Sequence, residues 1–204
     1  MKGSTTMAKR KKITTKSKII QAAWKLFYKQ GYENTTVDEI IDASNTSKGS
    51  FYHYFESKDA LLSTLSYLFD DKYEELAAEM PDTFTAQEKL SFLNHELFRM
   101  IDESIDVNLL SRLYSSQLIT KAEQHLLDEN RFYFRLIIQI ISDGYQHHEF
   151  RSGLSVDELV KLYVMYERGV IYDWCLNKAS YSIMEYSDRI LPDFLRMLEA
   201  PEKK

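Results

Sequence analysis

The chain has 204 residues, with 26 basic and 31 acidic side chains and a net charge of −5. This length suffices for one or two domains with a real core, and 6 glycines and 3 prolines are too few for turn-rich sheets or disordered linkers. The single cysteine, Cys175, excludes an internal disulfide and suits the reducing cytoplasm. No apolar run reaches the ~18 residues of a membrane span, and no secretory signal follows the basic N-terminus. We therefore expect a cytoplasmic protein.

The charge is unevenly distributed. Residues 1–59 hold 11 Lys and Arg against 6 Asp and Glu, a net charge of +5, and the other 145 residues hold 15 against 25, a net charge of −10. A basic end on an acidic body concentrates the attraction for phosphate at that end. The acidic total therefore does not exclude a nucleic-acid binder.

Residues 1–15 form a basic arm without acidic side chains, and its cluster is Lys9, Arg10, Lys11 and Lys12. One interpretation is a solvated, disordered tail. The other is an arm that condenses on phosphates or lies in a minor groove. The two are compatible, because a tail can become ordered only when it meets DNA.

A first helix is predicted over Lys16–Gln30. Its apolar residues recur at i, i+3, i+4 and i+7, and Gly31 is placed to end it. Trp24 lies on this apolar stripe, so we assign it to the core rather than to base stacking.

Two further short helices follow. Thr36 and Glu39 have the spacing of a capping box, in which each side chain bonds the other residue's backbone N–H, and they begin a helix over 37–43. Ser47 can cap the next helix, over 48–54, after a polar turn. Two short helices joined by a tight turn are the helix-turn-helix unit, whose second helix enters the DNA major groove.

The second of these helices has an inner and an outer side. Its apolar anchors, expected to face the other two helices, are Phe51, Tyr54 and Phe55. The outer side holds Lys48, Gly49, Ser50, Tyr52 and His53. Lysine and serine can bond base edges or phosphates, tyrosine and histidine reach phosphate or a thymine methyl, and glycine permits close approach. The competing interpretation is an exposed helix face without a partner.

The segment that carries a family resemblance is SKGSFYHYFESKDALL, which is similar to the recognition helix and next helix start of the TetR family of bacterial transcriptional regulators. The upstream segment IIQAAWKLFYKQGYENTTVDEII resembles the same family. The resemblance is specific over Lys16–Leu65, and elsewhere it is one of length and helical pattern. It implies a homodimer with a three-helix DNA-binding head, residues 16–57, and an all-helical effector-binding and dimerisation body, residues 58–204.

The resemblance also implies that Thr36 and Lys58, each at a helix N-terminus, clamp phosphates. With Ser47 and the basic arm, these residues complete the predicted DNA-binding set.

The body is predicted to be helical throughout. Ser or Thr followed three residues later by Glu marks helix starts at Thr85, Thr120, Ser155 and Ser182. The predicted helices are 58–79, 85–104, 107–118, 121–148, 155–177 and 183–199. No stretch alternates with period two long enough to predict a strand, so the fold class is all-α, with about nine helices.

The segment 155–177 is apolar around most of its circumference, which is typical of a helix buried on two sides. By resemblance, the last two helices pair across a dimer axis and the inner side of this one borders a ligand cavity. Burial in a monomer core is the competing account. Glu167, Arg168 and Asp173 interrupt the apolar stretch and need partners, either across an interface or in a cavity.

The aromatic-rich body suits a pocket for a small apolar or aromatic effector of unknown identity. The candidate lining residues are Phe98, Tyr114, Phe134, Tyr163, Tyr166, Glu167, Val170 and Trp174. Core packing is the alternative for each of them. On the helix 155–177, the side bearing Tyr163, Tyr166, Val170 and Trp174 faces either the cavity or the dimer axis.

No catalytic site, metal site or cofactor is predicted. The adjacent His147, His148 and Glu149 point about 100° apart on a helix, so they share no face. We find no Walker loop, GxSxG or HExxH motif. We assign Cys175 to packing, with redox sensing as the alternative.

The favoured hypothesis is a ligand-responsive transcriptional regulator, a repressor by resemblance. As a homodimer it would place two recognition helices about 34–36 Å apart on a palindromic operator, and a small molecule would release it. The alternative is a DNA-binding module without an effector, acting architecturally or through a protein partner. A ligand-dependent shift in operator affinity distinguishes the two.

Overall fold

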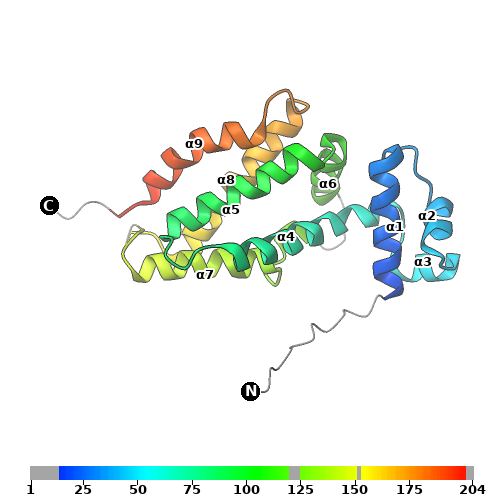
Figure 1. Cartoon of the computed structure of the whole chain (residues 1–204), viewed down its shortest axis with the longest axis horizontal. Helices are drawn as coiled ribbons and strands as arrows, with labels where there is room; N and C mark the ends of the chain where they lie inside the picture. The colour runs from blue at the N-terminus through cyan, green and yellow to red at the C-terminus, as the bar shows by residue number, and fades with distance from the viewer. Residues whose placement is uncertain (1–13, 120–124, 151–152, 201–204) are drawn as a thin grey trace, which may run out of the picture. The chain divides into compact units, whose positions relative to one another are not determined.

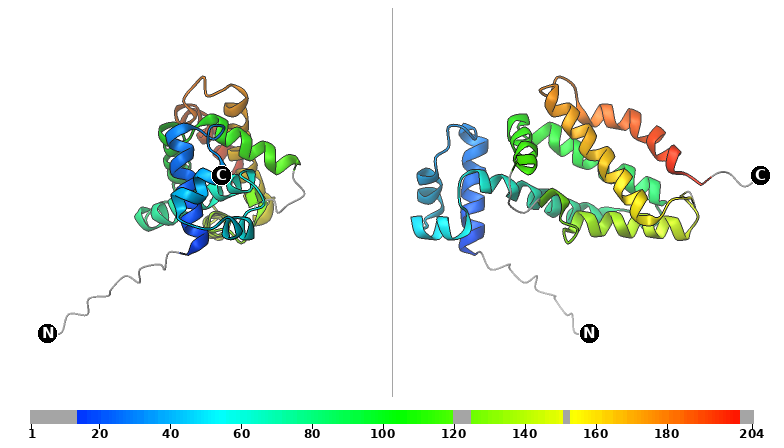
Figure 2. Two further views of the ribbon diagram at one scale, coloured as in Figure 1. Left: turned by 90° about the vertical axis from the view of Figure 1, so that its right-hand side faces the viewer. Right: turned by 180° about the vertical axis from the view of Figure 1, so that it is seen from behind.

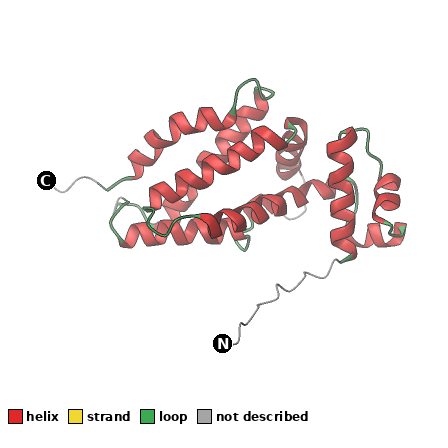
Figure 3. Ribbon diagram, in the orientation of Figure 1, coloured by secondary structure: helices red, strands yellow, loops and turns green. Residues whose placement is uncertain are grey.

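The computed structural model describes residues 14–119, 125–150 and 153–200. These residues are helical apart from loops and one isolated bridge between Phe150 and Glu199 (Figure 3), which confirms the all-α fold class. The chain divides into two compact units, Met1–Leu61 and Leu62–Lys204, whereas the sequence analysis drew this boundary after residue 57. The predicted basic arm lies almost entirely outside the described residues.

The first unit contains three helices, labelled in Figure 1: α1 (Thr15–Gln30), α2 (Val37–Ser44) and α3 (Lys48–Tyr54). Helix α1 packs against both α2 and α3. Trp24 is buried in this core, as predicted from its stripe. Gly31 ends α1 with a φ of 83°, in the left-handed region that glycine adopts without a steric cost.

The prediction for Tyr54 is wrong. It was expected to face the core, but it is 40% exposed, whereas Phe51 and Phe55 are 0% and 5% exposed. Helix α3 ends at Tyr54, and the backbone becomes extended at Phe55. This change of direction brings Phe55 into the core and leaves the Tyr54 ring beside His53, with 4.7 Å between ring centroids.

The second unit contains six helices within its described residues: α4 (Leu65–Glu79), α5 (Ala86–Ser104), α6 (Val107–Ile119), α7 (Phe132–Gln146), α8 (Val156–Leu176) and α9 (Ile183–Leu198). Helix α5 packs against α4, α7 and α9, and α8 packs against α6, α7 and α9. The right-hand view of Figure 2 shows α8 between α7 and α9. None of the described helices is long and apolar enough to cross a membrane.

The helix starts follow the local capping signals. Thr36, Thr85 and Ser155 each complete a capping box. Ser182 Oγ accepts a hydrogen bond from the Glu185 N–H at 3.1 Å. The fifth predicted start, at Thr120, lies outside the described residues.

The predicted helix 58–79 is not a continuous α-helix. Residues Asp59–Thr64 form a 3-10 helix, and α4 begins only at Leu65. The Leu61 N–H donates to the Lys58 carbonyl oxygen at 3.1 Å, which is the i to i+3 bonding of a 3-10 helix.

The predicted helix 121–148 is also wrong. A short 3-10 helix, His125–Leu127, is separated from α7 by a turn. In that turn the Asp128 side chain accepts the Asn130 N–H at 2.9 Å, and the Asp128 carbonyl accepts the Arg131 N–H at 3.2 Å. Such local bonds satisfy the backbone outside a helix, and apolar periodicity does not reveal them.

Candidate DNA-binding surface and effector cavity

Helix α3 is held by its cap and by the turn before it. Asn45, with a φ of 50°, makes the left-handed turn that ends α2. Ser47 Oγ accepts the Ser50 N–H at 3.1 Å and begins α3. Phe51 then anchors the inner side of the helix, since it is fully buried.

The outer side of α3 carries the predicted contact residues. Lys48, Gly49, Tyr52 and His53 are exposed, and Ser50 is partly buried beside its cap. Lys48 Nζ lies 3.4 Å from Asp38 Oδ1, and both side chains are exposed. Because exposed pairs of this kind contribute less than about 1 kcal/mol, the ammonium can exchange this carboxylate for a base edge or a phosphate.

Thr36 lies at the exposed N-terminus of α2 and is committed to the capping box. Glu39 Oε2 accepts the Thr36 N–H at 2.7 Å and the Thr36 hydroxyl at 2.9 Å. These bonds, the backbone one first, lower the pKa of Glu39. The phosphate-clamp role of Thr36 stays a prediction.

Lys58 is tied into the first unit. Its Nζ donates to the carbonyl oxygens of Tyr32 at 2.7 Å and Thr35 at 2.8 Å, and it lies 4.2 Å from the Tyr32 ring centroid. Burial lowers its pKa. These contacts give Lys58 a structural role within the first unit, and its predicted contact with phosphate stays a prediction.

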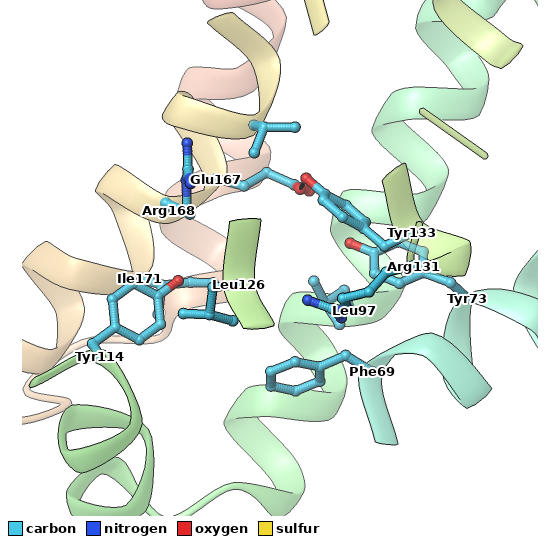
Figure 4. A pocket seen from close by; sticks show the side chains of 11 residues that line it. Phe69, Tyr73, Leu97, Tyr114, Leu126, Arg131, Tyr133, Glu167, Arg168 and Ile171 are labelled. Carbon is cyan, nitrogen blue, oxygen red and sulfur yellow. Dashed lines mark hydrogen bonds between the residues drawn. The ribbon is translucent and has the colours of Figure 1, made fainter. Parts of the chain in front are cut away.

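A cavity of about 50 Å³ lies in the second unit, which is room for one or two water molecules at ~30 Å³ each. Figure 4 shows its lining residues: Phe69, Tyr73, Leu97, Tyr114, Leu126, Arg131, Tyr133, Val164, Glu167, Arg168 and Ile171. They come from α4 to α8 and the turns before α7, and most of the wall is apolar.

Glu167 is the buried carboxyl of this cavity, 3% exposed. Its Oε1 accepts hydrogen bonds from Asn94 Nδ2 and the Tyr163 hydroxyl, both at 3.0 Å. Its Oε2 accepts the Tyr133 hydroxyl at 2.5 Å. Burial raises the pKa of Glu167, and the three hydrogen bonds oppose that rise.

The hydrogen-bond network continues from Glu167 to α9. Asn94 Oδ1 accepts the Ser187 hydroxyl at 2.6 Å, and the hydroxyls of Ser187 and Tyr166 lie 3.0 Å apart. The Tyr166 ring stacks on Phe194 with 4.6 Å between centroids. Buried polar groups thus link the cavity wall to the last helix.

A buried ion pair forms another part of the wall. Arg131 Nε lies 2.9 Å from Asp70 Oδ2, and Arg131 Nη2 lies 3.1 Å from Asp70 Oδ1. The Tyr133 N–H also donates to Asp70 Oδ1, at 3.1 Å. This two-pronged geometry fixes the start of α7 on α4.

Tyr73 places its hydroxyl in the cavity, as Figure 4 shows. Burial, followed by the nearby Glu167 carboxyl, raises the pKa of Tyr73 well above its ordinary value of 10.0. The hydroxyl is therefore protonated at neutral pH and is available as a donor.

Two of the eight predicted effector residues, Tyr114 and Glu167, line this cavity. The six that lie outside its lining are Phe98, Phe134, Tyr163, Tyr166, Val170 and Trp174. The Tyr163 hydroxyl donates a hydrogen bond to Glu167, and the Tyr166 ring stacks on Phe194 of α9. Trp174 is buried, and its Nε1 donates to the Tyr181 carbonyl oxygen at 2.9 Å, in the loop before α9.

Helix α4 was not predicted to line the cavity, although it supplies Phe69 and Tyr73. A signal was present: Asp70 is an acid among apolar residues of α4, and it is buried against Arg131. An acid inside an apolar face indicates a buried partner, which is the same reasoning that singled out Glu167.

His147, His148 and Glu149 serve other contacts. The His147 ring Nδ1 lies 2.7 Å from the Asp143 carbonyl oxygen, and Glu149 Oε2 accepts the Ala86 N–H at 2.7 Å. No cluster of three or more His, Cys, Asp or Glu suited to a metal occurs among the described residues.

Comparison with protein families gives two matches. Residues 19–65 match the family described as bacterial regulatory proteins, tetR family. Residues 69–196 match the family described as YsiA-like protein, C-terminal region. The second match alone spans more than half of the chain.

Individual proteins agree with these matches. The fatty acid metabolism regulator protein of Bacillus subtilis is 22% identical over 174 residues, 85% of this chain and 90% of that protein. The structure of FadR from Bacillus subtilis in complex with stearoyl-CoA is 21% identical and covers 87% of this chain and 96% of that chain, with a TM-score of 0.65. Thermus thermophilus FadR in complex with lauroyl-CoA, also 21% identical, covers 93% and 97% with a TM-score of 0.69.

The structural likeness supports the fold, and the family matches cover both the helix-turn-helix unit and the helical body. This chain belongs to the tetR family of bacterial regulatory proteins and is a DNA-binding transcriptional regulator.

Proposed function

We propose that this regulator is a repressor that binds a palindromic operator as a homodimer and is released by a fatty acyl-CoA. The observation that carries the proposal is a largely apolar cavity with a few buried hydroxyls in a chain whose α3 presents its polar side outward. The similarity to a fatty acid metabolism regulator, and to structures that contain stearoyl-CoA and lauroyl-CoA, supports this effector class.

The size of the cavity supports a ligand-dependent change in shape. At about 50 Å³ it is smaller than the ~300–1,000 Å³ of pockets that hold ligands of drug size. An acyl chain therefore binds only an expanded body, and it shifts the population towards that state. Phe69 and Tyr73 lie on α4, which follows the DNA-binding unit directly in the chain. Expansion at α4 would lower operator affinity, and DNA would lower effector affinity by the same factor.

An exposed apolar stripe on α8 supports the homodimer. Met165, Tyr172 and Leu176 are 51%, 49% and 63% exposed, and with Gly169 they recur at helical spacing along one side. Apolar side chains grouped in this way mark protein–protein contacts. A two-fold pairing of this face with its copy gives a symmetric dimer, and a symmetric dimer reads a palindrome.

The test measures operator binding with and without effector. A palindromic operator is first selected from random DNA, and its affinity is measured by fluorescence anisotropy. Lauroyl-CoA and stearoyl-CoA should weaken binding, whereas free coenzyme A and laurate should have little effect. If no acyl-CoA changes the operator affinity, the result would instead favour a DNA-binding module without this effector.

A further inference from the structure

The Tyr73 hydroxyl has no partner in the protein. Among the described residues, Tyr73 Oη is the one buried side-chain nitrogen or oxygen atom without a hydrogen bond. A buried hydroxyl that has left water without a new partner is unfavourable, so such a group calls for an explanation. Because Tyr73 lines the cavity and its hydroxyl points into it (Figure 4), the missing acceptor belongs in the cavity.

The polar groups around Tyr73 are already occupied. The Glu167 carboxyl accepts hydrogen bonds from side chains of α5, α7 and α8. Asp70 holds Arg131 through both of its oxygens. The Tyr73 ring also packs against the Tyr133 ring, with 4.9 Å between centroids, and this contact fixes the direction of the hydroxyl.

We propose that the Tyr73 hydroxyl donates a hydrogen bond to the thioester carbonyl oxygen of the acyl-CoA effector. The inference rests on the proposed function and assigns a recognition residue within it. The apolar side chains of Phe69, Leu97 and Ile171 in the same wall suit the alkyl chain next to that carbonyl.

The charges near Tyr73 disfavour an anionic group. The charged side chains that act on its hydroxyl are Glu167, Arg131 and Asp70. Asp70 neutralises Arg131, and Glu167 supplies no positive charge. Glu167, Arg131 and Asp70 offer a carboxylate at the hydroxyl no free cation. Arg168 also lines the cavity, so an anionic group is disfavoured at the position of the hydroxyl and not throughout the cavity.

The experiment compares two ligands that differ in the carbonyl oxygen alone. Lauroyl-CoA and S-dodecyl-CoA, in which a methylene replaces the carbonyl, are titrated calorimetrically into the full-length protein and into Tyr73→Phe. The wild-type protein should bind lauroyl-CoA about tenfold more tightly, and this preference should fall to about one in Tyr73→Phe. Tyr67→Phe, which removes an exposed hydroxyl from the same helix, is the control and should keep the preference.

The stability of the ligand-free protein provides a second readout. Since Tyr73→Phe breaks no hydrogen bond within the protein, the variant should melt at the same temperature as the wild type or higher. A lower melting temperature together with an unchanged ligand preference would give the hydroxyl a structural role and overturn the inference.

The outcomes separate this inference from the proposed function. If lauroyl-CoA releases the operator but the two ligands keep the same affinity ratio in wild type and Tyr73→Phe, the role of Tyr73 alone is refuted. If the wild-type protein binds neither ligand, both proposals are refuted.

Discussion

At the scale of single residues, the Tyr163 hydroxyl lies against two acceptors, one of which is Glu167. The Tyr163 hydroxyl carries one proton, yet its oxygen lies 3.0 Å from both the Leu90 carbonyl oxygen and Glu167 Oε1. A proton shared between the two acceptors stabilises an ionised Glu167 less than a proton donated to Glu167 alone. The raised pKa of Glu167, caused by burial, agrees with this arrangement.

The first prediction is that Glu167→Gln flattens the pH dependence of stability. A carboxyl whose pKa rises on folding holds its proton more tightly in the folded state. The free energy of unfolding should therefore fall as pH rises from the ordinary value of 4.5 through the raised pKa. Glutamine does not titrate, so the variant should gain stability relative to the wild type between about pH 5 and about pH 7.

Urea unfolding at those two pH values measures the effect. The neighbouring hydroxyls of Tyr73, Tyr133 and Tyr163 have pKa values raised well above 10.0 by burial, so they stay protonated in this range. Parallel stability profiles for the two proteins would show that Glu167 has no raised pKa.

The second prediction concerns the buried ion pair. Asp70→Ala leaves the Arg131 guanidinium, 8% exposed, without its carboxylate, and should lower the free energy of unfolding by about 3–5 kcal/mol. The matched control is Asp193→Ala, which breaks an exposed pair with Arg196 and should cost less than about 1 kcal/mol. Denaturant unfolding of both variants makes the comparison, and equal losses would contradict the burial argument.

At the scale of secondary-structure elements, buried anchors and a local cap hold α3 in place. Its outer side contributes little to the stability of the fold. Phe51 and Ser47 hold the helix, whereas Lys48 makes one exposed contact with Asp38. Stability and DNA contact therefore reside in different residues of the same short helix, and a substitution can separate them.

The third prediction uses that separation. Lys48→Ala should weaken specific operator binding about tenfold, because a base or phosphate contact is lost, and it should leave the thermal melting curve nearly unchanged. Lys25→Ala removes the same charge from an exposed position of α1 and is the control for net charge. If both variants lose the same affinity, Lys48 contributes only its positive charge and makes no specific contact with the operator.

At the scale of the whole molecule, the exposed apolar side of α8 remains unexplained within one chain. Tyr163 and Glu167 on its inner side belong to the body core, but Tyr172 and Leu176 on its outer side contact water in the single chain. Covering that surface with a second copy removes apolar area from water, which stabilises the pair.

The fourth prediction is that the wild-type protein is a dimer, as proposed, and that Tyr172→Glu is a monomer. A carboxylate at a two-fold contact meets its own copy and loses hydration, so the mutant should sediment as a monomer with unchanged helical content and weakened operator binding. Leu118→Glu introduces the same charge at a more exposed apolar residue of α6, 77% exposed, and should leave the dimer intact. A dimeric Tyr172→Glu would place the interface elsewhere.

The fifth prediction concerns the arm, which lies outside the described residues. Deleting residues 1–12 removes Lys9, Arg10, Lys11 and Lys12. If these side chains neutralise phosphates, the deletion should lower affinity for all DNA sequences and reduce the salt dependence by about 0.9 per lost contact in a log–log plot. An unchanged slope would mean that the arm does not contact DNA.

Features that depend on near neighbours in the chain could be predicted from the sequence. Thr36, Thr85 and Ser155 begin helices because a capping box needs only residues three positions apart. Gly31 ends α1 because its own backbone preference permits the left-handed turn. Within the first unit, the same local reasoning predicted all three helices to within a residue or two.

The cavity could not be predicted in this way, because its contacts join residues far apart in the chain. The sequence predicted that Glu167 needs a buried partner, but that partner, Asn94, lies 73 positions away in the chain. Trp174 and Glu167 both lie on α8, and only the packing of the helices decides that Trp174 bonds the Tyr181 carbonyl oxygen and Glu167 the Tyr133 hydroxyl. Helical spacing gives the angle between two side chains but not the neighbour that each one meets, since that neighbour depends on how whole helices pack.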